Sequence, residues 1–281
     1  VIIVVVNAFS WYFPLYVFFE NILEKSQVEI SVLLATLSIH YIGAIGFSFV
    51  GTTLIKKFPS RSMFLCLWML IGVASSATLL MLDVNNIPYL LSVSFLLGIS
   101  LGLGFPSCLA YFGDHSLDEN RGRLGGITFL ASGLSMLLIG LLVSMSPLAI
   151  GALTFIFWRG LGLILFLIFK PKQEIRQSVT EVSYKSILLD RSFALYLVPW
   201  VMFCLVNFFE IRIVTNFLGA DLSSLMPIAE FGIGGFSALI GGWFADSVGR
   251  KRIVIFGFMM LGIGYGILGL FSNITVTSYL Y

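Results

Sequence analysis

The amino-acid sequence predicts an all-α, polytopic membrane protein, and three observations support this fold class. Hydrophobic residues make up 58% of the 281 residues and charged residues only 11%, whereas a soluble domain carries roughly 25% charged residues. The mean hydropathy is +1.02. The apolar residues form long runs of about 20, the length that a helix needs to cross a bilayer, without the ten-residue alternation of barrel strands. These features exclude a water-soluble fold.

Nine apolar spans are predicted along the chain. They cover residues 1–19, 30–54, 62–82, 87–112, 124–144, 147–169, 192–214, 222–245 and 251–271, and a tenth run begins near Thr275. The chain starts without Met and stops inside this tenth run. We therefore expect it to be a piece of a longer membrane protein.

The positions of the basic residues predict the orientation of the spans. Thirteen of the 16 Lys and Arg residues follow the even-numbered spans, whereas the opposite segments are mostly acidic. Because Lys and Arg are retained in the cytoplasm, the even-numbered spans should exit on the inner side. We expect a multi-pass protein of the cell membrane with a cytoplasmic N-terminus.

One long polar segment divides the chain. Residues 170–191 carry mixed charge and follow six spans, and at least three more spans come after them. This predicts an N-terminal six-helix bundle over 1–169, a cytoplasmic linker over 170–191 and a partial C-terminal bundle over 192–281. Within the linker, Val182–Leu189 is predicted to form a short amphipathic helix on the membrane surface.

The cytoplasmic loop after the eighth span carries the most specific pattern, GWFADSVGRK. Gly242 permits close approach of another helix, Asp246 suits the positive N-terminus of a helix, and Gly249 permits a tight reversal. Arg250 and Lys251 anchor the inner face or pair with carboxylates. An ordinary basic loop with a glycine turn would explain the cations but not an Asp at this spacing.

A weaker copy of this pattern follows the second span. Gly51 and the basic Lys56, Lys57 and Arg61 are present, but Ile55 occupies the position of the Asp.

The fourth span and the loop after it carry a second pattern. Gly98, Gly102 and Pro106 recur at every fourth position, and an acidic loop residue precedes Arg121 and Arg123. Small residues at this spacing are also ordinary helix-packing devices, so the glycines alone are not specific.

In these motifs the chain resembles the major facilitator superfamily of secondary transporters, in which the loop pattern follows helix 2 and is repeated after helix 8. The resemblance implies two six-helix bundles around a central site that opens alternately to either side. The chain would cover about nine and a half of the family's twelve helices, with its subgroup left open. The resemblance also implies that the loop after the eighth span acts as a cytoplasmic latch, in which Asp246 meets the start of the fifth span near Arg121 and Arg123.

Charges inside the hydrocarbon are costly and usually functional. Arg159 lies near the middle of the sixth span, where it either binds a buried carboxylate or carbonyl or contacts substrate. Glu230 in the eighth span is a candidate for proton coupling, or an acid in a water-filled vestibule. Glu210 lies near the outer end of the seventh span and is a candidate for the outer gate.

Other polar side chains in the spans are candidates for the central cavity. His40 titrates near neutrality when water reaches it, although a lone helical His is more often a packing residue. Tyr12 and Tyr16 share one face of the first span at a spacing of four. Asn7 and Asn207 are polar candidates on the first and seventh spans.

The sequence lacks a phosphate loop, a zinc-ligand pair and a nucleophile elbow, and its three cysteines are far apart in apolar stretches. We therefore expect no enzyme activity, no cofactor and no metal, and no nucleic-acid partner. The predicted function is secondary active transport of a small solute, with the proton as candidate coupling ion, or facilitated transport, by a monomer in the lipid bilayer. The alternative is a non-transporting sensor or scaffold of the same fold. Convergence of the polar candidates on one midplane cavity would favour transport.

Overall fold

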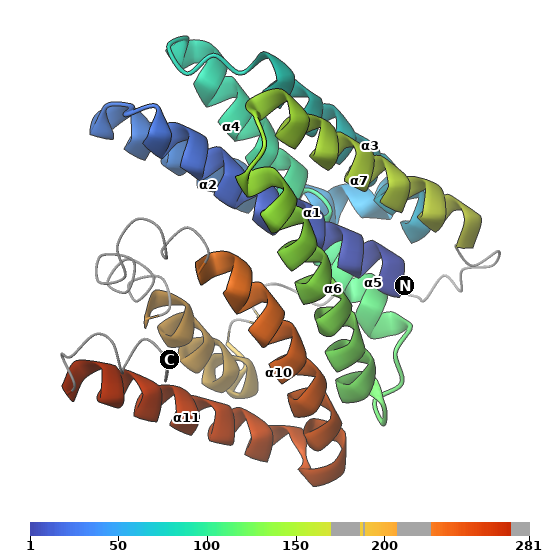
Figure 1. The fold of residues 1–281 in the computed structure, drawn as a ribbon. Helices are drawn as coiled ribbons and strands as arrows, with labels where there is room; N and C mark the ends of the chain where they lie inside the picture. The colour runs from blue at the N-terminus through green and yellow to red at the C-terminus, as the bar shows by residue number, and fades with distance from the viewer. Residues whose placement is uncertain (170–185, 188, 207–225, 271–281) are drawn as a thin grey trace. The chain divides into compact units, whose positions relative to one another are not determined.

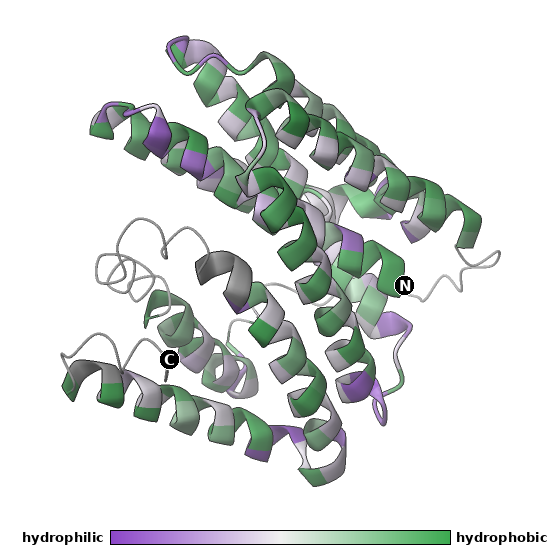
Figure 2. Cartoon of the chain, viewed as in Figure 1, coloured by the Kyte–Doolittle hydropathy of each residue, from purple (hydrophilic) through white to green (hydrophobic). Residues whose placement is uncertain are grey.

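The computed structural model describes residues 1–169, 186–187, 189–206 and 226–270 (Figure 1). Across these residues the regular structure is helical and contains no strand. Six of the described helical segments are long and apolar enough to cross a membrane, and Figure 2 shows hydrophobic residues along their whole length. The predicted all-α, polytopic fold is confirmed.

The helices follow the predicted spans closely. The first six spans are α1 (Ile2–Lys25), α2 (Ile30–Leu54), α3 (Arg61–Thr78), α4 (Ile87–Gly102) with α5 (Phe105–Asp114), α6 (Arg121–Ser144) and α7 (Leu148–Phe169). Single 3-10 turns, η1 (Ile55–Lys57) and η2 (Leu79–Met81), extend α2 and α3. Further along lie the helix Arg191–Val206, α10 (Met226–Val248) and α11 (Arg250–Leu270).

Some predicted features fall outside the described residues. These are most of the amphipathic helix at Val182–Leu189, the last eight residues of the seventh span, the first four residues of the eighth span and the run after Thr275.

The fourth span is two helices rather than the continuous one predicted over 87–112. The break lies at Leu103 and Gly104, just before Pro106. Proline has no backbone N–H and its ring clashes with the carbonyl of the preceding turn, so α4 ends there. Proline suits the first turn of the next helix, and α5 begins at Phe105. A Cβ on Gly104 would overlap the Trp68 indole, so the break also brings α3 close.

Two helix starts are fixed by side chains that accept a hydrogen bond from the first turn. Ser60 Oγ accepts from the Met63 N–H at 3.1 Å before α3. Asn86 Oδ1 accepts from the Tyr89 N–H at 3.2 Å before α4. Each side chain satisfies an N–H that has no partner within its helix.

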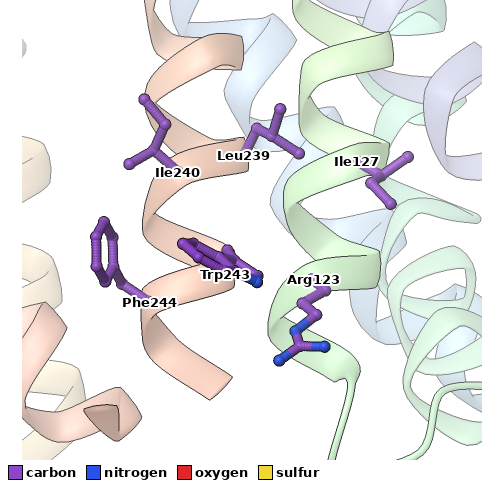
Figure 3. A pocket seen from close by; sticks show the side chains of 6 residues that line it. All are labelled: Arg123, Ile127, Leu239, Ile240, Trp243 and Phe244. Atoms are coloured by element: carbon purple, nitrogen blue, oxygen red, sulfur yellow. The ribbon is translucent and has the colours of Figure 1, made fainter. Parts of the chain in front are cut away.

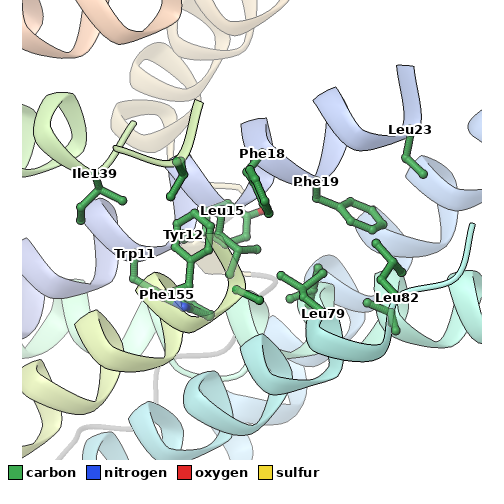
Figure 4. Packing of buried hydrophobic residues seen from close by; sticks show 14 of the residues in the cluster. Trp11, Tyr12, Leu15, Phe18, Phe19, Leu23, Leu79, Leu82, Ile139 and Phe155 are labelled. Atoms are coloured by element: carbon green, nitrogen blue, oxygen red, sulfur yellow. The ribbon is translucent and has the colours of Figure 1, made fainter. Parts of the chain in front are cut away.

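The core is built around α1. One apolar cluster gathers Trp11, Leu15 and Phe19 of α1 with residues of η2, α4, α6 and α7 (Figure 4). A second cluster joins Val4 and Val5 of α1 to α3, α5 and α7. Lipid tails are as apolar as these side chains, so van der Waals packing and interhelical hydrogen bonds, rather than the hydrophobic effect, hold such helices together.

By its contacts the chain forms two compact units. The first contains residues 1–174 and 228–254, so α10 groups with the first six spans. The second contains residues 175–227 and 255–281. There, Phe203 of the helix Arg191–Val206 meets Phe258 of α11 edge to face, with ring centroids 6.1 Å apart. The predicted division into two bundles at the linker stays a prediction.

Candidate functional site

Within the first unit, α10 crosses α6 at backbone contact distance because glycines line the crossing (Figure 1). A Cβ on Gly242 would overlap the Gly122 carbonyl, and a Cβ on Gly126 would lie 2.7 Å from the Ala238 carbonyl oxygen. Further along the same crossing, Gly133 of α6 is equally close to α10. Small residues allow two helix backbones to approach in this way, and this close packing drives the association of helices in a membrane.

At the end of this crossing where α6 begins, the Asp246 carboxylate caps α6. Its Oδ1 accepts a hydrogen bond from the Gly122 N–H at 3.0 Å and its Oδ2 accepts from the Arg123 N–H at 2.7 Å. Its side chain is only 2% exposed. The side chain of the residue before the helix, Asn120, makes no capping bond, so the first-turn N–H groups of α6 remain for Asp246. A carboxylate there also faces the positive end of the helix dipole.

Two arginines organise the loop beside Asp246. Arg121 pairs with Asp118 (Nη1 to Oδ1, 2.8 Å), and its Nε donates to Ser116 Oγ at 2.9 Å. Arg250 donates to the Asp118 carbonyl, and its Nη2 lies 4.0 Å from Asp246 Oδ1. The guanidinium of Arg121 thus holds the α5–α6 loop rather than Asp246.

The turn between α10 and α11 depends on glycine. Gly249 has φ +109, a conformation that L side chains rarely adopt. Arg252 N–H bonds back to the Gly249 carbonyl at 3.2 Å and starts α11. Lys251 is exposed in the first turn of α11.

The weaker copy of the loop pattern contacts α3 and α5. Ile55, at the position of the Asp, packs against the second apolar cluster. Arg61 at the start of α3 forms an ion pair with Asp114 at the end of α5. This loop therefore holds α3 to α5, whereas the Asp246 loop holds α10 to α6.

Arg159 is fully buried in α7 and forms what we call the arginine cluster with Asn7, Trp11 and Trp68. Its guanidinium carbon lies 4.5 Å from the Trp11 ring centroid and 4.3 Å from that of Trp68. Indole faces attract a cation electrostatically. Nη1 donates to Asn7 Oδ1 at 2.7 Å, and among the described residues Nε and Nη2 have no hydrogen-bond partner. The cation is stabilised by rings and one amide rather than by a carboxylate.

The surroundings fix this cluster in one arrangement. Asn7 Nδ2 donates to the Trp158 carbonyl at 2.8 Å, which turns Asn7 Oδ1 toward Arg159. Glycines make the necessary space: a Cβ on Gly72 would lie 2.7 Å from Arg159 Nε, and one on Gly162 would overlap the Asn7 amide. The cluster therefore ties α1, α3 and α7 together.

Tyr12, Tyr16, His40 and Tyr41 form a second polar group, the tyrosine–histidine cluster. His40 Nδ1 lies 3.1 Å from the Ser94 carbonyl oxygen, and His40 Nε2 lies 2.7 Å from the Tyr12 hydroxyl. A carbonyl can only accept, so Nδ1 carries the proton and Nε2 of the neutral ring accepts from Tyr12. The Tyr16 and Tyr41 hydroxyls lie 2.9 Å apart beside this pair.

Within the described residues, several polar candidates from the sequence belong to two neighbouring clusters, which adjoin at Trp11 and Tyr12 with ring centroids 6.2 Å apart. Asn7, which was expected in the cavity, belongs to the arginine cluster, and His40 belongs to the tyrosine–histidine cluster. Glu230 is exposed on α10. Asn207 and Glu210 lie outside the described residues.

Sequence reasoning missed Trp11 and Trp68 as partners of Arg159. The available signal was an arginine in the middle of a span without any acidic residue in the other predicted spans of the first bundle. A cation placed there needs aromatic faces or carbonyl groups, and tryptophans in other spans are the natural suppliers.

The apolar spanning helices of the described residues define a polytopic membrane protein. The family model described as Major Facilitator Superfamily matches residues 1–281 of the chain. The chain therefore belongs to this family, whose members are generally transporters rather than enzymes. No curated protein matches the chain.

Proposed function

We propose that this protein moves a small solute across the cell membrane by alternating access, and that Asp246 is its cytoplasmic latch. The observation that carries the proposal is the buried Asp246 carboxylate on the first-turn N–H groups of α6. In the predicted two-bundle organisation α6 and α10 belong to different bundles, so this contact would close the inner side. We further propose that the protein acts as a monomer with its N-terminus in the cytoplasm.

The chemistry of the contact suits a latch that opens in every cycle. A charge that faces the opposite end of the helix dipole typically contributes about 0.3–1 kcal/mol to stability, rising to about 2 kcal/mol in partly buried geometries. When the helices separate, water can solvate both the carboxylate and the N–H groups. The contact is therefore strong enough to favour the closed arrangement and weak enough to be broken reversibly.

The tyrosine–histidine cluster supports the proton as coupling ion. A second proton on His40 would make Nε2 a donor, so that the Tyr12 hydroxyl must turn to accept and direct its own hydrogen elsewhere. The groups that face the ring are Tyr12 and Tyr16 from α1, Tyr41 from α2 and the Ser94 carbonyl from α4. Proton uptake would thereby change the contact between α1 and α2. The exposed Glu230 is the second candidate for the coupling group.

The test is uptake and efflux of a panel of solutes by the full-length protein in proteoliposomes, with and without a pH gradient. We expect at least one solute to move, faster with the gradient, and Asp246→Asn to reduce its rate. The matched control is Asp83→Asn, which changes an exposed acid on the opposite side of the spans. Full-rate transport by Asp246→Asn would contradict the latch.

The alternative function is a sensor or scaffold that does not transport. The burial of Asn7, His40 and Arg159 in packed helix interfaces favours it, because a transporter needs polar groups that face a solute. In that case no solute of the panel would move in either direction, although the protein would remain folded.

A further inference from the structure

An apolar groove lies between α6 and α10, beside the latch. Its volume is about 450 Å³, within the range of small-molecule sites. Figure 3 shows its walls, which come from both helices: Arg123, Ile127, Leu239, Ile240, Trp243 and Phe244. Except for one cation, the side chains that line the groove are apolar or aromatic.

That cation, Arg123, lies at the cytoplasmic end of the groove. Its backbone N–H bonds to Asp246, but in the part of the chain that the structure describes, its guanidinium forms no ion pair or hydrogen bond. Arg123 is the third residue of a spanning helix and is exposed. Arginine at the end of a span lies at the level of the lipid headgroups.

We propose that this groove binds one anionic phospholipid, with an acyl chain along Ile127, Leu239 and Trp243 and the phosphate on the Arg123 guanidinium. Guanidinium recognises phosphate through paired N–H donors. An acyl chain has no polar group to satisfy, so it suits the apolar walls. A peptide segment would leave backbone N–H and C=O groups without partners there.

Such a lipid would contact both helices of the latch. A ligand that binds one arrangement of two helices shifts the population toward that arrangement. Because the groove has walls from α6 and α10 together, it exists only while the two helices are crossed. The anionic lipid would therefore favour the closed latch, whether or not the protein transports.

The experiment is tryptophan quenching by lipids with brominated acyl chains in reconstituted vesicles of the full-length protein. The Trp243 signal is the difference between the wild type and Trp243→Phe. We expect brominated phosphatidylglycerol to occupy the groove about fivefold better than brominated phosphatidylcholine, the effect of one cation near the surface. Arg123→Gln should remove this preference, and Arg123→Lys should retain most of it. The control is Lys251→Gln, an exposed cation that does not line the groove.

Three results would overturn the proposal. Quenching of Trp243 by acrylamide but not by brominated lipid would show that the groove faces water. Absence of quenching by either agent would show that protein covers it. An equal lipid preference in the wild type and Arg123→Gln, with circular dichroism showing both folded, would show that Arg123 does not select the headgroup.

Discussion

The arginine cluster provides a prediction that separates two explanations of how buried Arg159 is stabilised. Either Asn7 stabilises the cation together with the two indoles, or the indoles do so alone. Asn7→Leu removes the amide that accepts from Arg159 Nη1, and it also removes the bond to the Trp158 carbonyl. Arg159→Met replaces the cation with a flexible apolar side chain. A hydrogen bond to a charged group is worth about 1.5–3 kcal/mol, and the Trp158 bond is lost in either background. Asn7→Leu should therefore cost about 1.5–3 kcal/mol more in the wild type than in Arg159→Met.

The assay is reversible unfolding of the wild type, the two single variants and the double variant in mixed micelles, analysed as a double-mutant cycle. We expect the double variant to be less destabilised than the sum of the two single changes. If Asn7→Leu costs the same in both backgrounds, Asn7 does not stabilise the cation, and the two indoles alone account for the burial of Arg159.

Two further predictions concern the helix crossing and the proton. Gly242→Val should destabilise the crossing by about 1–3 kcal/mol, the usual cost of overpacking, because its Cβ would overlap the Gly122 carbonyl. The control is Gly241→Val, where a Cβ meets nothing within 4 Å. This variant should be nearly neutral in the same unfolding assay. His40→Gln should abolish the dependence of solute uptake on a pH gradient, while exchange without a gradient should continue. Tyr12→Phe should reduce the same dependence. Unchanged gradient dependence in both variants would exclude the tyrosine–histidine cluster as the coupling site.

The fold class could be predicted from local patterns, whereas the contact of Asp246 with the start of α6 was predicted from the resemblance to the family. Apolar runs of about 20 residues identify spanning helices, and the pattern from Gly242 to Arg250 covers only the end of α10 and the start of α11. The break before Pro106 was missed because hydropathy shows the length of an apolar run but not where a proline lacks the N–H for a helical hydrogen bond. A periodic hydropathy pattern would also not reveal which face of a span is inward, since lipid and protein interior are equally apolar.

The particular partners of Arg159 were missed for a different reason. Asn7 was expected to face the cavity, yet it bonds to α7 because Gly162 leaves space for its amide. Trp11 and Trp68 reach Arg159 from separate helices. Such a site depends on the rotation of three helices about their axes, which local spacing does not specify.

The latch is tested most directly by the distance between α6 and α10 in single molecules. Fluorophores at Leu117→Cys, in the loop that leads into α6, and at Ser247→Cys, near the end of α10, would report it in reconstituted protein. Both positions are exposed, and the native cysteines would be replaced by serine. The account predicts a close and a separated population, with Asp246→Asn shifting their ratio toward separation by about five- to thirtyfold, as expected for a loss of one to two kcal/mol. Asp83→Asn should leave the ratio unchanged. A single population with the same distance in the wild type and Asp246→Asn would contradict the account.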